Sequence, residues 1–500
     1  MSEIRLRYAG LINFASQLLS IVTGFLFVVA VTRNLTMSDF GIWQNIGDIL
    51  GYATLLAGVV PFSVTRYVAR GQDDAAKTGL LANIILSLPL TGLFILLAPF
   101  FASAIGADSI HFQVAGFQVF LIHLLSVTQA VVQAKAPHLL GYGTFIYEVT
   151  KIALGVYLVV LLEKGLLGAI ITVIISQAVL SLFYLICIRK QVLLKVNWRY
   201  LRSWWKISFI NMFSLLGDRL GSIGLILLIL MWGELARAYV GAAMTIAMMI
   251  GYSNYLAIAL YPKLLAKSDP ESVVTTLKLT MLFAIPMTGG IVVLSESLLS
   301  ILKLDYAVVS TTLIFYALFY LLDCFNVLFS TIVMATEDAD IHEKVTIREL
   351  ARSRLFLFPL LKYLNAGLYL IPLIVLLTTV AGNPLQAAFL TGATSLVAAM
   401  PVLLLRYKIA IRSLPFRLPL VSLGRYAFST VIMMLLLSQI RLGATLSRVL
   451  FLVLLGGGIY FGIVLVIDAE TRSLVREIVY FLLRKLGNRD AGIRNSELST

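Results

Sequence analysis

The sequence contains few charged residues, two cysteines and four histidines. Charged side chains make up 13 % of the 500 residues, about half the share found in a soluble domain. Cys187 and Cys324 lie far apart, each within an apolar run, and we expect both to be small interior side chains. No two histidines are spaced as metal ligands, so no metal site is indicated. These shortages argue against a soluble enzyme.

Long apolar segments fill the chain instead. Hydrophobic residues make up 60 % of it, and the mean hydropathy is +0.96. A membrane-spanning helix needs about 20 apolar residues, because each residue adds ~1.5 Å to a helix that crosses ~30 Å of hydrocarbon. We predict about 14 transmembrane helices, at 11–32, 41–64, 79–102, 112–134, 142–162, 166–188, 207–231, 239–261, 273–299, 307–334, 359–381, 385–405, 421–440 and 446–467. An all-α, polytopic membrane protein is therefore expected.

Basic residues gather in every second gap between these segments. Of the 39 lysines and arginines, 31 fall on one side if the N-terminus is inside: 28 in gaps and tails, and Lys278, Lys362 and Arg425 just within the adjoining helix ends. This asymmetry is the positive-inside pattern, and it places both termini in the cytoplasm of a multi-pass plasma (inner) membrane protein. We therefore assign the net charge of +14 to membrane orientation and to contacts with anionic lipids, and expect no nucleic-acid partner.

An internal repeat appears at an offset of 200 residues. Gly41 and Gly241 open corresponding segments, and Gly51-Tyr52 and Gly251-Tyr252 follow ten residues later. Two parallel six-helix halves would result. The predicted units are an N-terminal half at 1–203, a C-terminal half at 204–412, two additional helices within 413–470, and a cytoplasmic amphipathic helix with a disordered tail at 471–500. A second surface helix is predicted at 341–356.

Three stretches resemble a known family. The run from Arg33 to Gly41, RNLTMSDFG, is similar to the junction between the first two helices of Wzx-type polysaccharide and O-antigen flippases, with Thr36 in place of the usual glycine. The run 64–70, VTRYVAR, and the run 238–262 resemble two further family elements. These flippases belong to the multidrug/oligosaccharidyl-lipid/polysaccharide exporter (MOP) superfamily. The resemblance implies two six-helix bundles around a central cavity, plus two extra helices. It also implies alternating-access export of a lipid-linked oligosaccharide, with polysaccharide polymerases as partners.

Six ionisable residues fall deep inside predicted helices, roughly 9–18 Å from the helix ends. Each such residue costs about 2.5–3.5 kcal/mol at the membrane centre and needs a partner or a wet cavity. Glu148 and Lys151 are three residues apart and can pair on one helix face. Asp218 and Arg219 are adjacent, so their side chains diverge by about 100°. The other two are Asp48 and Asp323.

The resemblance implies roles for these residues. Arg219 and Lys151 would contact the pyrophosphate of a polyprenyl carrier, since arginine suits bidentate phosphate contacts. Arg33 and Arg66 stand at the two mouths, as substrate ligands or as snorkelling anchors. The acids Asp48, Asp323, Asp218 and Glu148 could carry a coupling sodium ion or proton; no other cofactor is expected. A purely structural ion-pair network is the alternative for all of them.

Two other functions remain open. A cation-coupled multidrug extruder of the same superfamily would use an acidic cavity, and the interior candidates include four acids. A membrane-embedded glycosyltransferase or polysaccharide polymerase would need a large outer loop, whereas the longest predicted outer gaps are about ten residues long. No phosphate-binding glycine loop or nucleophile triad appears either. We therefore expect a transporter rather than an enzyme.

Overall fold

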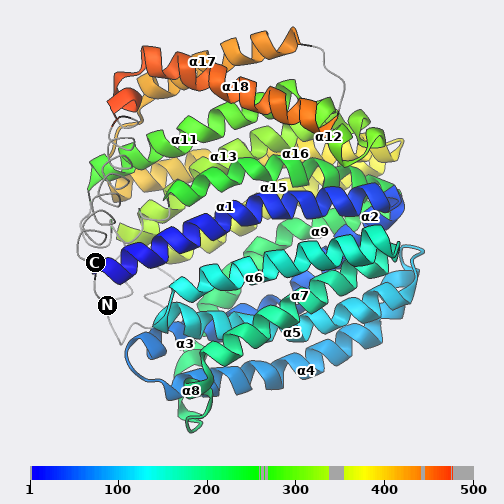
Figure 1. The fold of residues 1–500 in the computed structure, drawn as a ribbon, viewed down its shortest axis with the longest axis vertical. Coiled ribbons are helices and arrows are strands. Elements are labelled where there is room, and N and C mark those ends of the chain that lie inside the picture. The colour runs from blue at the N-terminus through cyan, green and yellow to red at the C-terminus, as the bar shows by residue number, and fades with distance from the viewer. Residues whose placement is uncertain are drawn as a thin grey trace, which may run out of the picture.

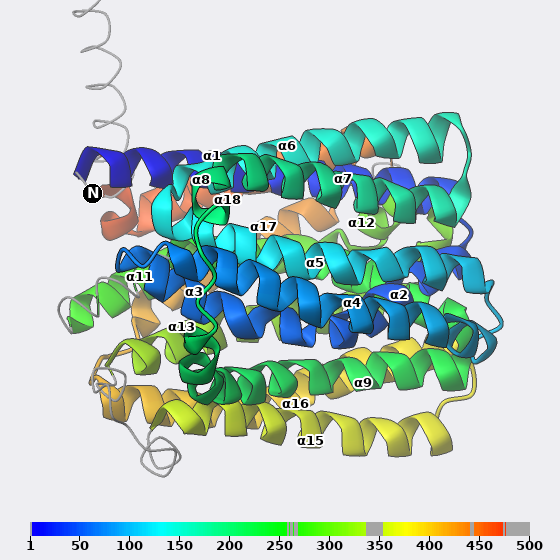
Figure 2. The same cartoon turned by 90° about the horizontal axis from the view of Figure 1, so that it is seen from below.

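The computed structural model describes residues 3–257, 260, 264, 269–336, 354–440, 445–473 and 476. Within them every regular element is helical, which confirms the all-α prediction. The long helices lie side by side in one stack, as two views at right angles show (Figure 1, Figure 2). We call the end where α1 begins and α18 finishes the terminal end of the stack, and the opposite end the distal end.

Residues 3–192 form what we call the N-terminal lobe. Its helices are α1 (Glu3–Asn34), α2 (Met37–Ala53), the 3₁₀ turn η1 (Leu55–Gly58), α3 (Val59–Ala69), α4 (Asp74–Ser103), α5 (Ser109–Lys135), α6 (His138–Gly155), the π-helical η2 (Val156–Leu161), α7 (Gly165–Cys187) and α8 (Arg189–Val192). The closest pairings in this lobe are α4 with α5 and α1 with α6.

Residues 199–413 form the C-terminal lobe, and two further helices follow it. The elements are α9 (Arg199–Ala247), η3 (Met248–Ala257), α11 (Pro270–Val293), α12 (Ser295–Leu302), η4 (Leu304–Val309), α13 (Ser310–Thr336), α15 (Arg354–Thr379), α16 (Pro384–Ser413), α17 (Leu420–Ser438) and α18 (Leu446–Ile467). The last two pack against α11 at one edge of the stack (Figure 1).

In the part of the chain that the structure describes, 11 helices are long and apolar enough to cross a membrane, or up to 12 if the bent pair of α2 and η1–α3 is one span. Each of the 14 predicted segments overlaps a helix, and the count of 14 stays a prediction. The predicted surface helices at 341–356 and 471–486, and the tail after them, fall mostly outside the described residues.

The second predicted segment is broken by a bend of 53° between α2 and the η1–α3 stretch. Pro61 has no N–H to donate to the Ala57 carbonyl four residues earlier. The Asn83 side chain in α4 donates to that carbonyl instead, at 3.4 Å. Gly51 precedes this break, and Gly251 lies inside the 3₁₀ stretch η3 that follows α9. Gly51 is thus still α-helical, two residues before the end of α2, whereas Gly251 is part of a 3₁₀ stretch.

Helix α9 contains a break at Gly233, where φ is 79° and ψ is 177°. This conformation is open to glycine and costly for other residues. Contacts with α2 show the change of direction. Before the break, Arg219 lies against Gly51; after it, Glu234 lies against Gly41, and Gly241 lies against Gln44. The two arms of α9, before and after Gly233, therefore run along α2 in opposite directions.

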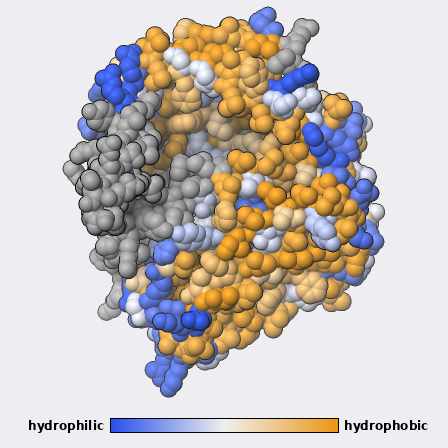
Figure 3. All heavy atoms as spheres, in the orientation of Figure 1, coloured by the Kyte–Doolittle hydropathy of each residue, from blue (hydrophilic) through white to orange (hydrophobic). Residues whose placement is uncertain are grey.

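The surface of the stack has the polarity that a membrane requires. Figure 3 shows a broad apolar band, with most of the hydrophilic residues at the two ends of the helices. Long helices also expose large apolar side chains, among them Leu96 of α4, Leu454 of α18 and Leu435 of α17, at 75 %, 75 % and 61 % exposure. Side chains this apolar are stable in lipid and not in water. The multi-pass membrane assignment therefore stands.

Candidate functional site

The predicted pair of Glu148 and Lys151 forms inside the N-terminal lobe. The Lys151 ammonium lies 2.8 Å from the Glu148 carboxylate, and both side chains are buried. The same carboxylate accepts hydrogen bonds from Ser20 at 2.8 Å and from Thr23 at 2.7 Å, both on α1. Lys151 also lies over the Tyr147 ring, 4.9 Å from its centroid. This pair is fully partnered and ties α6 to α1.

Asp48 pairs with Arg237. The predicted helices at 207–231 and 239–261 put Arg237 in the outer gap between them. That placement is wrong: Arg237 lies in the second arm of α9 and is 3 % exposed. Its Nε and Nη2 donate to the two Asp48 oxygens at 2.7 and 3.0 Å, in the bidentate geometry that arginine favours. The pair joins the N-terminal lobe to the C-terminal lobe.

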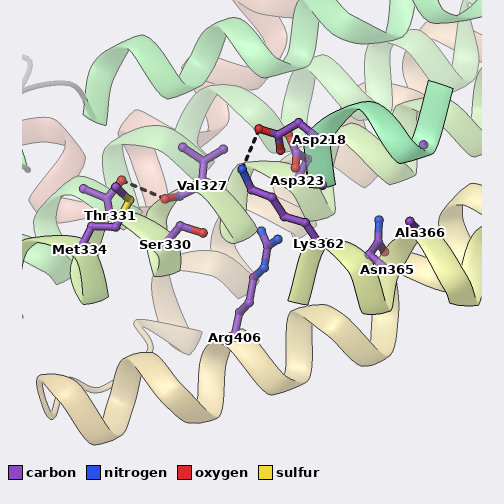
Figure 4. Close-up of a pocket in the computed structure, with 12 residues that line it drawn as sticks. Asp218, Asp323, Val327, Ser330, Thr331, Met334, Lys362, Asn365, Ala366 and Arg406 are labelled. Atoms are coloured by element: carbon purple, nitrogen blue, oxygen red, sulfur yellow. Dashed lines mark hydrogen bonds and ion pairs between the residues drawn. The ribbon is translucent and has the colours of Figure 1, made fainter. Parts of the chain in front are cut away.

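The remaining two acids line a cavity of about 450 Å³ among α9, α13, α15 and α16. The Lys362 ammonium lies 2.7 Å from the Asp218 carboxylate and 2.9 Å from the Ser214 hydroxyl. Asp323 shares the cavity with Arg406, whose positive charge acts on it. Figure 4 shows Lys362 reaching up to Asp218, with Arg406 directed toward the same group of charges.

Arg219 differs from the other interior cations. It is exposed, although it lies in the middle of an apolar span. Its guanidinium lies against Gly51 of α2, where a Cβ atom would be 2.7 Å from Nη1. Among the described residues, no carboxylate lies within ion-pair distance of it. As predicted, the side chains of Asp218 and Arg219 lie on different surfaces of α9, because Asp218 pairs with Lys362.

Tyrosines connect these groups across the two lobes. The Tyr52 hydroxyl donates to the Arg219 carbonyl at 2.6 Å, and its ring lies within electrostatic reach of both Asp48 and the Arg219 side chain. Tyr252, its counterpart in the proposed repeat, lies within similar reach of Glu148. Tyr52 therefore links Asp48 to Arg219, and Tyr252 brings the C-terminal lobe close to the Glu148–Lys151 pair.

Arg33 lies in the last turn of α1, and Arg66 lies in the last turn of α3. Arg33 Nε donates to the Ile301 carbonyl at 2.9 Å, while the Lys303 ammonium donates to the Leu35 carbonyl at 3.1 Å. Each base thus binds a carbonyl at the C-terminal end of the other lobe's helix, where positive charge is favourable. Arg66 lies over the Phe62 ring, 4.7 Å from its centroid. Arg33 therefore contributes to a distal closure between the lobes.

The sequence reading missed three cations of this interior: Arg237, Lys362 and Arg406. Arg237 follows a predicted helix end, and the other two lie at the basic ends of predicted helices, where lysine and arginine normally orient the chain. The acids could have pointed to them, because a carboxylate at membrane depth requires a partner or a wet cavity.

At the level of sequence, no protein-family model and no curated protein matches the chain. Solved structures do match it. The lipid II flippase MurJ, in an inward closed conformation, superposes with a TM-score of 0.69 over 93 % of this chain and 100 % of that chain, at 14 % identity. An inward-facing multidrug resistance MATE family transporter of the MOP superfamily gives 0.60, over 81 % and 98 %, at 14 % identity.

A third match is a MOP superfamily transporter from Pyrococcus furiosus, with a TM-score of 0.53 over 82 % of this chain and 95 % of that chain, at 15 % identity. The chain has the fold of these transporters. The predicted fold class is thereby confirmed.

Proposed function

We propose that the protein is a flippase that moves a polyprenyl-pyrophosphate-linked oligosaccharide across the plasma membrane by alternating access, for surface polysaccharide synthesis. The observation that carries this proposal is Arg219, an exposed guanidinium without a carboxylate partner among the described residues. A lone arginine at membrane depth is costly and marks a substrate pathway.

The charge balance of the interior supports an anionic substrate. The four acids Asp48, Glu148, Asp218 and Asp323 each face a cation: Arg237, Lys151, Lys362 and Arg406, respectively. Arg219 is the fifth cation, and it leaves this set with one excess positive charge. A planar guanidinium binds a diphosphate through two parallel hydrogen bonds. Lys151, also proposed as a phosphate ligand, would have to leave Glu148 to serve.

The multidrug extruder remains the alternative of the same fold, since MATE transporters are among the structural matches. A cationic drug would need a carboxylate that is free to bind it. Each interior acid here already has a basic neighbour, so this balance favours the flippase. An enzymatic function has less support, because the matched proteins are transporters.

The distal closure and the charge asymmetry together suggest an orientation. We place the terminal end, with both chain termini, in the cytoplasm, where the basic residues would gather. The Arg33 and Lys303 contacts then close the external side. In this arrangement Arg219 would be approached from the cytoplasm, where lipid-linked saccharides are assembled before export. Contact with a polysaccharide polymerase is proposed on the outer side.

The proposal is tested at Arg219. Arg219→Ala should be inserted at normal levels, because no carboxylate loses its partner, but transport should fall roughly 10- to 100-fold, as expected for hydrogen bonds to charged groups worth about 1.5–3 kcal/mol. Arg219→Lys should keep part of the activity, since lysine keeps the positive charge but lacks the paired N–H donors of the guanidinium. The measurements are membrane abundance and rescue of a polysaccharide-export mutant. Full rescue by a well-expressed Arg219→Ala would exclude the substrate role.

Coupling to a sodium ion or proton is a separate proposal. Asp48 and Asp323 are the first candidates, and Asp218 and Glu148 follow. Compared at equal amounts of folded protein in the membrane, Asp48→Asn and Asp323→Asn should each abolish gradient-driven export, while the folded protein still binds a polyprenyl diphosphate. If both variants export normally in the presence of a gradient, neither carboxylate is the coupling group.

A further inference from the structure

The cavity beside α9 is built differently from the surroundings of Arg219. The four charged groups that line it among the described residues balance in sign: Asp218 pairs with Lys362, and Asp323 faces Arg406. A metal cation would have to displace an ammonium or a guanidinium, and an anion would meet two carboxylates. The cavity therefore favours a ligand that is polar and has no strong charge of its own.

The uncharged groups of the cavity supply further donors and acceptors. Ser330 donates its hydroxyl proton to the Asn326 carbonyl at 2.7 Å, and Thr331 donates to the Val327 carbonyl at 2.9 Å. Their oxygen lone pairs remain as acceptors. The Asn365 Oδ1 atom is buried and has no hydrogen-bond partner among the described residues. Figure 4 shows Asn365 and Lys362 on one wall, opposite Ser330 and Thr331.

A saccharide matches this set of groups. Each sugar hydroxyl both donates and accepts, so it can bridge a carboxylate or hydroxyl oxygen on one side and an amide or ammonium on the other. The volume of about 450 Å³ lies within the usual range for small-ligand sites, ~300–1,000 Å³. A buried amide oxygen without a donor costs about 1–3 kcal/mol, which a bound hydroxyl would offset.

We propose that this cavity is a saccharide subsite that binds the first sugar of the substrate. The inference rests on the proposed function, in which Arg219 binds the adjoining diphosphate. Asp218 and Arg219 are neighbours whose side chains diverge by about 100° around α9. A ligand that continues from a diphosphate at Arg219 into its first sugar would therefore reach from one face of α9 to the next.

The test uses the full-length protein in lipid nanodiscs and two probes. One is a long-chain polyprenyl diphosphate without sugar, and the other is the same carrier bearing one N-acetylhexosamine. The wild-type protein should bind the sugar-bearing carrier at least about 10-fold more tightly, a difference of ~1.4 kcal/mol. Asn365→Leu and Thr331→Val should each reduce this ratio several-fold and leave the affinity for the bare carrier unchanged.

A matched control separates the subsite from general effects of losing a threonine. Thr378 of α15 also donates to the carbonyl four residues before it, at 2.9 Å, but does not line the cavity. Thr378→Val should keep the wild-type ratio. Equal wild-type affinity for the two probes would overturn the subsite, as would a wild-type ratio in both cavity variants. Failure to bind either probe would instead overturn the proposed flippase function.

Discussion

The Asp48 carboxylate and the Arg237 guanidinium form a two-pronged ion pair between the lobes, although 189 residues separate them in the chain. Both side chains are largely buried, at 11 % and 3 % exposure. Removing one partner of such a pair leaves an uncompensated charge in an apolar interior. We therefore expect Arg237→Met or Asp48→Asn alone to lower the stability by about 3–5 kcal/mol.

The double variant Asp48→Asn/Arg237→Met should recover most of that loss, because no charge is left unpaired. Thermal unfolding of the purified protein in detergent measures all three variants. Lys135 and Asp73 form a more accessible pair, at 35 % and 32 % exposure, and serve as a control; Lys135→Met should cost less than about 1 kcal/mol. Equal losses of stability on breaking the two pairs would contradict the expectation that burial makes the Asp48–Arg237 pair more important.

Gly41 allows the second arm of α9 to pack directly on α2. A Cβ atom at this position would lie 2.0 Å from the Glu234 carbonyl oxygen, a backbone atom. Gly41→Ala should therefore separate the two helices and destabilise the distal closure. Gly47 on the same helix has open space around it, so Gly47→Ala should be neutral or stabilise the helix by up to about 1 kcal/mol. Labelling of a cysteine placed at Ser38 should become faster with Gly41→Ala alone.

The reciprocal contacts of Arg33 and Lys303 favour the distal-closed state. Arg33→Ala/Lys303→Ala should raise the distal-open population roughly tenfold, which corresponds to ~1.4 kcal/mol. Spin labels at Asn34 and Leu304, in a background lacking Cys187 and Cys324, would report the change as longer distances. Arg448→Ala removes a basic side chain elsewhere and should leave the distances unchanged. Unaltered distances in the double variant would show that other contacts hold this end closed.

Variants of the Glu148–Lys151 pair distinguish a purely structural role of the pair from a substrate contact by Lys151. Lys151→Met leaves the Glu148 carboxylate buried without its ammonium, and the protein level in the membrane should fall. Glu148→Gln/Lys151→Met should restore that level. Export then decides the role: a well-expressed double variant that exports normally would assign the pair to structure alone. Loss of export at a normal protein level would support a phosphate contact by Lys151.

Local spacing predicted some of this interior correctly. Glu148 and Lys151 lie three residues apart on one helix, so their pairing follows from helical geometry alone. The divergence of Asp218 from Arg219 follows in the same way. Partners that come from other helices could not be read from spacing. Asp48 meets Arg237 and Asp218 meets Lys362 because of tertiary packing between segments 189 and 144 residues apart.

The gathering of basic residues in every second gap predicted the class of protein correctly but misplaced individual residues. It identified a polytopic membrane protein, whose fold the structural matches support. It also counted Arg237 as a loop residue and Lys362 as an orienting charge, because both lie near the predicted ends of helices. The break at Gly233 explains the first error, since a one-residue reversal leaves no loop for Arg237 to occupy.

This reversal places Arg219 and Arg237 on the two arms of α9, and both arms rest on α2, one arginine against Gly51 and the other bound to Asp48. Gly51 and Asp48 are less than one helical turn apart, so they move as a rigid unit. A shift of α2 along its axis must alter the surroundings of both arginines at once. The surroundings of the Arg219 guanidinium and the strength of the inter-lobe ion pair thus depend on one structural variable, the position of the 17-residue helix α2.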